Sequence, residues 1–121
     1  MDNELDPKLL SRDEAEVRAY VDDPLVHRRI STRLFTEMVA AMGRVQGDGA
    51  GWKFPLLMLL GESDRIVSVE AAKAFFAKVG QSDKSLKTYP EFKHEPFHEI
   101  GRQEAFDAVG QWILKKVKGE A

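Results

Sequence analysis

The order of the elements predicted from the sequence indicates an α/β fold with parallel strands. In the 121 residues, an apolar run at 54–60 and a second short strand at 85–89 each precede a loop and a helix. A helix between two strands is the connection that parallel pairing requires. The apolar run also lacks alternation, which is typical of a strand that is buried on both faces. We therefore expect two parallel strands with flanking helices.

Two helices are predicted ahead of the first strand. Ser11 and Glu14 have the spacing of a capping box, so a short helix is expected from Ser11 to about residue 20, before Pro24. Ser31 is the predicted cap of a second helix, which the glycine-rich, flexible linker at 47–51 should end. The apolar positions of this second helix recur at helical spacing: Leu34, Phe35, Met38, Val39, Met42 and Val45.

Two further helices are expected after the strands. Ser68 suits the start of a helix that runs through Val79, with Gly80 as its C-terminal cap. The second strand leads into a loop at 90–101 and then into a last helix at about 102–117. One face of this last helix is apolar: Ala105, Phe106, Val109, Trp112, Ile113 and Val117.

The composition excludes several classes of function. Eighteen basic and 20 acidic residues give a net charge of −2, which argues against a nucleic-acid binder that relies on a basic surface. Without cysteine, the chain has no disulfide, no thiolate nucleophile and no zinc–cysteine site. The longest apolar run is too short to span a bilayer, and the acidic start does not read as a signal peptide. We expect a cytoplasmic protein, with peripheral contact to membranes left open.

Asp64 and His94 are the candidate catalytic residues. Each lies in a loop that follows a predicted strand, and such loops leave a parallel sheet at the same edge. An aspartate beside a histidine forms two-thirds of a nucleophile–base–acid triad, in which the carboxylate orients the imidazole and the imidazole moves the proton. A lone loop aspartate also serves as a turn or cap residue, and a lone loop histidine is often solvated. These structural roles stay open at this point.

Ser63 is the alternative nucleophile within the chain. The stretch Gly61-Glu62-Ser63-Asp64-Arg65 resembles a G-x-S-x-G nucleophile elbow, and Ser63, Asp83 and His94 follow the chain order of such a triad. Arg65 stands where the elbow needs its second glycine, which disfavours this interpretation.

The other histidines are weaker candidates. His98 follows His94 by four residues with Glu95 and Glu99 nearby, but the spacing matches no established metal site. His27 lies between the two N-terminal helices and is expected to be structural, with a place along a substrate path as the alternative. The sequence contains no P-loop and no G-x-G-x-x-G. We therefore expect neither a metal nor a cofactor.

Four stretches of the chain together resemble one protein family. They are 11–20 with Asp23-Pro24-Leu25-Val26-His27, the helix at 31–42, the region 55–67, and 84–99 with Tyr89-Pro90-Glu91-Phe92-Lys93-His94-Glu95. In this order they are similar to the C-terminal half of a monoacylglycerol lipase or lysophospholipase, in the serine aminopeptidase S33-like group of α/β-hydrolases. The resemblance covers nearly the whole chain.

The resemblance implies the C-terminal portion of an α/β-hydrolase fold with an incomplete sheet. Residues 1–30 would be the end of the cap or lid region, and residues 31–121 the C-terminal part of the hydrolase core. Asp64 would be the triad acid, and His94 rather than His98 the triad base. Several side chains of the cap segment would be candidates to line the acyl pocket: Leu5, Leu9, Leu10, Val17 and Tyr20.

The family's nucleophile elbow and oxyanion-hole loop lie upstream of the resembling segment and are absent from these 121 residues. The expected function is therefore that of a C-terminal fragment of a serine ester hydrolase, acting on monoacylglycerols, lysophospholipids or similar esters. Whether this chain alone is an enzyme is left open. Its expected partners are a lipid-like ester and either the missing N-terminal hydrolase half or a second copy. The alternative function is a non-catalytic α/β module that acts through association or self-assembly.

Overall fold

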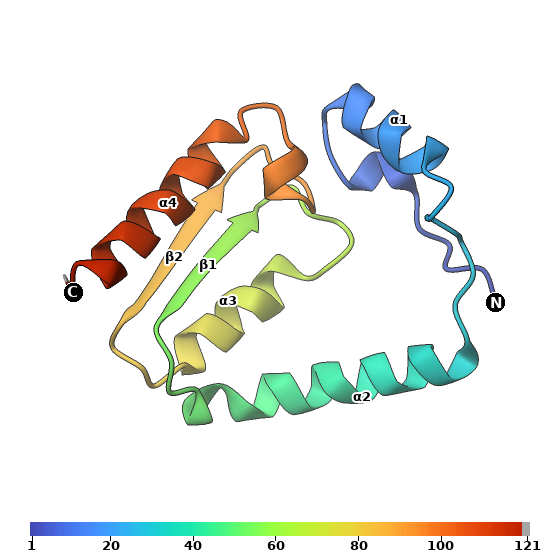
Figure 1. The fold of residues 1–121 in the computed structure, drawn as a ribbon. Coiled ribbons are helices and arrows are strands. Elements are labelled where there is room, and N and C mark those ends of the chain that lie inside the picture. Colours follow the sequence, from blue (N-terminus) through green and yellow to red (C-terminus); the bar gives the residue numbers. More distant parts are fainter. Residues whose placement is uncertain (120–121) are drawn as a thin grey trace.

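Two parallel strands lie at the centre of the structure, a computed structural model that describes residues 1–119 (Figure 1). Strand β1 (Leu56–Gly61) pairs with β2 (Lys84–Tyr89) along their whole length, from Leu56 opposite Lys84 to Gly61 opposite Tyr89. Helix α3 (Val69–Lys78) connects the strands, and α4 (Gln103–Val117) follows β2. The two helices flank the strand pair on opposite sides in Figure 1. The predicted α/β arrangement with an incomplete sheet is confirmed.

The strands are less buried than the apolar run predicted. Residues 56–60 are all partly exposed, and in the described part of the chain each strand has a hydrogen-bonded neighbour on one side only. The prediction that this run is buried on both faces is wrong for residues 1–119. The buried cluster is small and lies at the carboxyl ends of the strands, where Tyr89 and Phe92 stack at 4.6 Å above Ala105 and Leu59.

Asp13, not Ser11, caps the first α-helix. Helix α1 (Glu14–Asp22) follows a short 3-10 turn at Pro7–Leu9, and the Asp13 carboxylate accepts the N–H of Ala15 at 3.0 Å. Ser11 is buried, and its hydroxyl donates to the backbone carbonyl of His98 at 2.7 Å. The predicted capping box is therefore wrong, because Ser11 is used for a contact with a distant loop.

Helix α2 (Thr32–Asp48) begins at its predicted cap, since the Ser31 hydroxyl accepts the N–H of Leu34 at 3.0 Å. Its end differs from the prediction, because the expected flexible linker continues the helix to Asp48 and then forms a 3-10 turn at Gly49–Gly51. Figure 1 shows α2 extending away from the strands. Its apolar side chains remain 41–54% exposed: Leu34, Phe35, Met38, Val39, Met42 and Val45.

Helix α3 begins as predicted and ends differently. The Ser68 hydroxyl accepts the N–H of Ala71 at 3.1 Å, which confirms the predicted N-cap. At the other end the N–H of Val79 donates to the carbonyls of Phe75 and Phe76. Gly80 does not adopt the positive φ of a glycine cap, so that prediction is wrong.

Candidate functional site

The Asp64 carboxylate shapes the loop that follows β1. Its Oδ1 accepts the backbone N–H groups of Ile66 at 2.7 Å and Val67 at 3.1 Å. Only 8% of the Asp64 side chain is exposed. These two bonds hold the carboxylate in one orientation and leave Oδ2 available for a second partner.

That partner is His94. The Nδ1 atom of His94 lies 2.9 Å from Oδ2 of Asp64, and the imidazole is 32% exposed. An ionised carboxylate at Nδ1 selects the tautomer that carries its proton there, so the lone pair of the neutral ring is on Nε2. A ring held in this way is arranged to accept a proton at Nε2 and to remain stabilised once it is charged.

Backbone hydrogen bonds join the two loops that carry these residues. The N–H of Glu62 donates to the carbonyl of Tyr89 at 2.9 Å, and the N–H of Ser63 donates to that of Phe92 at 3.0 Å. Gly61 makes this approach sterically feasible, because a Cβ there would lie 2.1 Å from the carbonyl oxygen of Lys93. The parallel strands and this glycine therefore place Asp64 beside His94.

The alternative triad through Ser63 does not form. The Ser63 hydroxyl donates to the carbonyl of Pro90 at 2.9 Å. Asp83 lies just before β2, at the opposite end of the strand pair from His94, and its Oδ2 accepts Nζ of Lys116 at 2.6 Å. His94 therefore has Asp64 rather than Asp83 as its carboxylate partner.

The remaining histidines are separate from this pair. The Nδ1 atom of His98 lies 3.1 Å from a Glu95 carboxylate oxygen at the surface, whereas the nearby Glu99 is buried. Within residues 1–119, no three His, Cys, Asp or Glu side chains converge in a metal-binding arrangement. His27 is exposed, and its Nδ1 accepts the N–H of Arg29 at 3.3 Å, a local contact.

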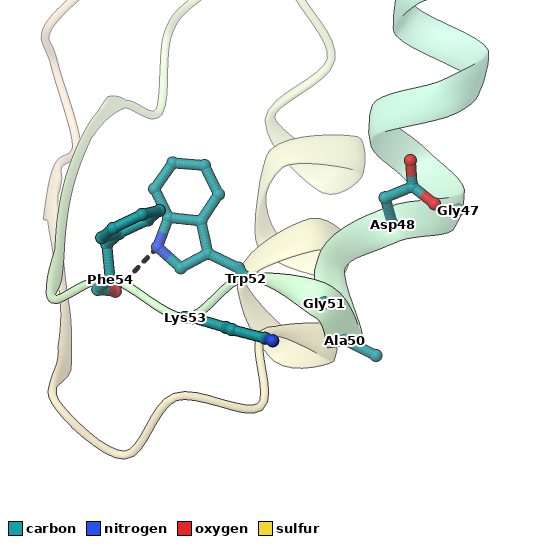
Figure 2. A pocket seen from close by; sticks show the side chains of 7 residues that line it. All are labelled: Gly47, Asp48, Ala50, Gly51, Trp52, Lys53 and Phe54. Carbon is teal, nitrogen blue, oxygen red and sulfur yellow. Dashed lines mark hydrogen bonds between the residues drawn. The ribbon is translucent and has the colours of Figure 1, made fainter.

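Two of the surface cavities lie in different parts of the molecule. One, of about 570 Å³, is lined by α1, by three residues that precede α1 and by Lys93, and it includes Val17, one of the predicted pocket-lining residues. Figure 2 shows another, of about 640 Å³, between the end of α2 and the segment before β1. There Trp52 Nε1 donates to the carbonyl of Phe54 at 2.8 Å. The second cavity lies before the amino end of β1, so it is not part of the Asp64–His94 site.

Sequence reasoning missed three residues that organise this region: Gly61, Arg12 and Glu99. Gly61 was weighed only as part of a nucleophile elbow, and Glu99 only as a metal ligand. The glycine at the end of the apolar run was a usable signal for Gly61, since close approach of two backbones favours glycine. No local pattern identifies the contact between Arg12 and the buried Glu99, which joins residues 87 positions apart at 2.9 Å.

Solved structures define the class of fold. The chain matches part of the monoacylglycerol lipase of Paleococcus ferrophilus with a TM-score of 0.90 and 34% identity, over 95% of this chain and 45% of that one. A soluble variant of the Saccharomyces cerevisiae monoglyceride lipase, in complex with a substrate analog, gives a TM-score of 0.84 over 95% of this chain and 43% of that one. At 23% identity, the second match shows the fold alone. The described residues therefore align with part of an α/β-hydrolase.

The family follows from the sequence. Residues 1–101 match the family described as serine aminopeptidase, S33, and the chain belongs to that family. The monoacylglycerol lipase of Mycolicibacterium smegmatis is 31% identical over 111 residues, which are 91% of this chain and 40% of that protein. The human monoglyceride lipase is 30% identical over 108 residues, covering 79% of this chain and 36% of that protein. The predicted resemblance is confirmed, and the chain spans less than half the length of these relatives.

Helix composition adds one finding about membranes. Within residues 1–119, no helix combines the length and the apolar character needed to cross a bilayer.

Proposed function

We propose that this chain is part of a serine hydrolase that cleaves carboxylic esters, with Asp64 as the acid and His94 as the base of a Ser–Asp–His triad. The observation that carries the proposal is the 2.9 Å contact between His94 Nδ1 and Asp64 Oδ2, at the carboxyl ends of two parallel strands. Membership of the serine aminopeptidase S33 family supports it.

In this proposal His94 moves the proton during acyl transfer. Its Nε2 accepts the proton of a serine hydroxyl as the serine Oγ attacks the ester carbonyl, and the same nitrogen returns that proton to the departing alkoxide. Water then repeats the sequence on the acyl-enzyme. Asp64 remains ionised, accepts the Nδ1–H of His94 and stabilises the imidazolium that forms in each step.

The nucleophile is proposed to come from a segment outside these 121 residues. Within residues 1–119 the serine nearest in sequence to the site, Ser63, donates to the Pro90 carbonyl, and Ser11 donates to that of His98. Ser31 and Ser68 accept helix N–H groups. The oxyanion-hole donors are assigned to the same outside segment.

The same proposal includes a class of substrate and a role for residues 1–30. Several relatives are monoacylglycerol lipases by name, so we propose lipid-like esters such as monoacylglycerols or lysophospholipids as substrates. Residues 1–30 are proposed as the end of a cap, since Ser11 and Arg12 contact the loop that carries His94. A cytoplasmic location stays a prediction.

The test supplies the missing part. The chain is fused to the portion of the Mycolicibacterium smegmatis lipase that it does not match, and hydrolysis of a monoacylglycerol is measured. We expect Asp64→Asn to lower kcat by about 10⁴, because it loses the correct tautomer of His94, and His94→Ala to lower kcat by about 10⁶, because it loses the base. His98→Ala is the matched control and should retain activity, because its side chain is exposed and pairs only with Glu95.

Two results would contradict the assignment. One is activity that survives both Asp64→Asn and His94→Ala. The other is a fusion whose serine reacts with a fluorophosphonate probe, which shows an assembled nucleophile, but whose reactivity is the same with and without those substitutions.

A second candidate function is association without catalysis. The observation that favours it is the apolar face of α2, whose side chains are about half exposed in the single chain, together with the outer edges of β1 and β2, which have no strand partner within residues 1–119. Sedimentation of the chain distinguishes the two, since a monodisperse folded monomer counts against the association function.

A further inference from the structure

Glu99 is the one large side chain of residues 1–119 that is completely enclosed, with 0% exposure. Its carboxylate accepts four N–H donors, two on each oxygen. Oε1 accepts the backbone N–H groups of Lys93 at 2.8 Å and Arg12 at 3.1 Å. Oε2 accepts Nε of Arg12 at 2.9 Å and the N–H of Ile100 at 3.1 Å. A buried carboxylate persists only when it is satisfied in this way.

Backbone bonds to this cluster hold the residues on both sides of His94 in the chain. Lys93 immediately precedes His94, and its N–H donates to Glu99. Glu95 immediately follows His94, and its N–H donates to the carbonyl of Leu10 at 3.0 Å, in the segment that Arg12 holds to Glu99. The backbone on each side of His94 is thus attached to one cluster centred on Glu99.

The N-terminal segment completes this cluster. Arg12 donates through both its backbone and its side chain to Glu99, and its Nη1 pairs with the exposed Glu91 at 2.7 Å. The hydrogen bond to Glu99 is the main cause that raises the pKa of the Arg12 guanidinium. Lys93 Nζ donates to the carbonyl of Lys8 at 2.6 Å. The expected end of the cap and the loop of His94 therefore form one hydrogen-bonded unit.

We propose that Glu99 is a positioning residue that holds the His94 imidazole against Asp64 through the backbone N–H of Lys93, and that it couples this loop to the N-terminal segment through Arg12. The inference rests on the proposed function, because it assigns Glu99 a task only if His94 is the base. Glu99 does not itself exchange protons with a substrate, since it is enclosed and both oxygens are occupied. Catalytic geometry tolerates displacements of only about 0.5 Å, so the position of His94 depends on the bonds that fix its neighbours in the chain, including the bond from the Lys93 N–H to Glu99.

The experiment observes His94 directly by NMR of the full chain. The Nδ1–H proton in the bond to Asp64 should give a downfield signal, which Asp64→Asn should abolish and so assign. In Glu99→Gln an amide N–H₂ replaces one carboxylate oxygen, so the two donors on that oxygen lose their acceptor: either the backbone N–H groups of Lys93 and Arg12, or Nε of Arg12 and the N–H of Ile100. We expect the His94 signal to broaden, with solvent exchange at least about tenfold faster.

The matched control is Glu91→Gln. It makes the same chemical change next to the same Arg12 guanidinium, but Glu91 is 80% exposed and does not contact Lys93. The His94 signal should therefore be unchanged. An unchanged signal in folded Glu99→Gln would overturn the inference and leave the proposed function standing. Absence of the signal from the unmodified chain would overturn the proposed function and the inference with it.

A measurement on the unmodified chain applies if Glu99→Gln does not fold. The Lys93 N–H is bonded to an enclosed carboxylate, whereas Glu91 lies exposed in the same loop. We expect the Lys93 amide to exchange at least about 100-fold more slowly than the Glu91 amide. Equal exchange of the two amides in the folded chain would overturn the inference.

Discussion

Asp64 makes two kinds of contact through its two carboxylate oxygens. Oδ1 accepts the N–H groups of Ile66 and Val67, as a turn residue does, and Oδ2 faces His94. The sequence left the turn role and the triad role open as alternatives. The structure shows the turn role, and the turn bonds fix the direction in which Oδ2 points, whereas the triad role stays a proposal.

Gly61 is a residue at which a single methyl group should disturb the site. In Gly61→Ala the new Cβ would lie 2.1 Å from the carbonyl oxygen of Lys93 and 2.4 Å from that of Phe92. Backbone atoms cannot rotate away, so the loop of His94 must move. We expect the free energy of unfolding, measured with urea, to fall by about 3 kcal/mol.

The control for this prediction is Gly43→Ala in α2. A Cβ there meets nothing within 4 Å, and alanine favours the helix over glycine by about 1 kcal/mol. This variant should be as stable as the unmodified chain or more so. Equal stability of the two alanine variants would show that the two loops approach less closely than the structure indicates.

Tyr89 should make stability depend on pH in alkaline solution. Burial, with a smaller contribution from the charge of Glu104, raises the pKa of its phenol. The folded state therefore holds this proton more tightly than the unfolded state, whose tyrosine pKa is about 10. Stability is fully present below that value and is lost as pH rises through the folded pKa.

Tyr89→Phe should remove this part of the alkaline loss, as measured by urea unfolding from pH 8 to 11. Near neutral pH it should change stability little, since the hydroxyl reaches the Glu104 carbonyl only at 3.5 Å. Tyr20→Phe is the control and should unfold in alkali like the unmodified chain. A Tyr89→Phe chain with the same alkaline loss would contradict the prediction.

At the scale of elements, some helix N-caps follow from the adjacent sequence, whereas others depend on tertiary contacts. Ser31 and Ser68 each accept an N–H three residues ahead, as predicted, because such a cap needs only the adjacent turn. Ser11 had an equally good local pattern. Its hydroxyl donates instead to the His98 carbonyl, and Asp13 caps the helix.

The cap of α3 offers a quantitative test. Ser68→Ala leaves the N–H of Ala71 without its acceptor and should lower the free energy of unfolding by about 1 kcal/mol. Ser82→Ala is the control, because that hydroxyl is exposed and makes only a 3.4 Å contact with Gln81. Thermal or urea unfolding that shifts equally in the two variants would argue against the cap.

The predicted burial of strand β1 depends on other elements that would have to cover it. Its uninterrupted apolar sequence is that of a strand covered on both faces, yet residues 56–60 are partly exposed. The chain spans less than half the length of its relatives, so the burial predicted by the sequence exceeds what residues 1–119 supply.

At the scale of the whole molecule, the apolar face of α2 should govern association. Leu34→Lys with Met38→Lys places two charges on that face, where the side chains are about half exposed. We expect the variant to remain folded and to sediment at a smaller apparent mass than the unmodified chain at the same concentration. The reason is that charge disfavours burial of this face in any contact between chains.

The control carries the same two charges at the same spacing on another face of α2, as Thr36→Lys with Ala40→Lys. Both positions are exposed. Its sedimentation should match that of the unmodified chain. Equal effects of the two pairs would attribute any change to net charge rather than to the apolar face.

The sequence by itself determined the order of helices and strands, the caps at Ser31 and Ser68, and the placement of Asp64 and His94 at one edge of a parallel sheet. These features depend on periodicity, on the nearest turn, or on a topological rule that holds for any parallel pair. Only the tertiary structure decided that Glu99 is enclosed, that Arg12 reaches it, and that the Ser11 hydroxyl donates to the His98 carbonyl instead of capping a helix. Those contacts join residues 87 positions apart, and no local pattern encodes which distant backbone will arrive beside a given polar side chain.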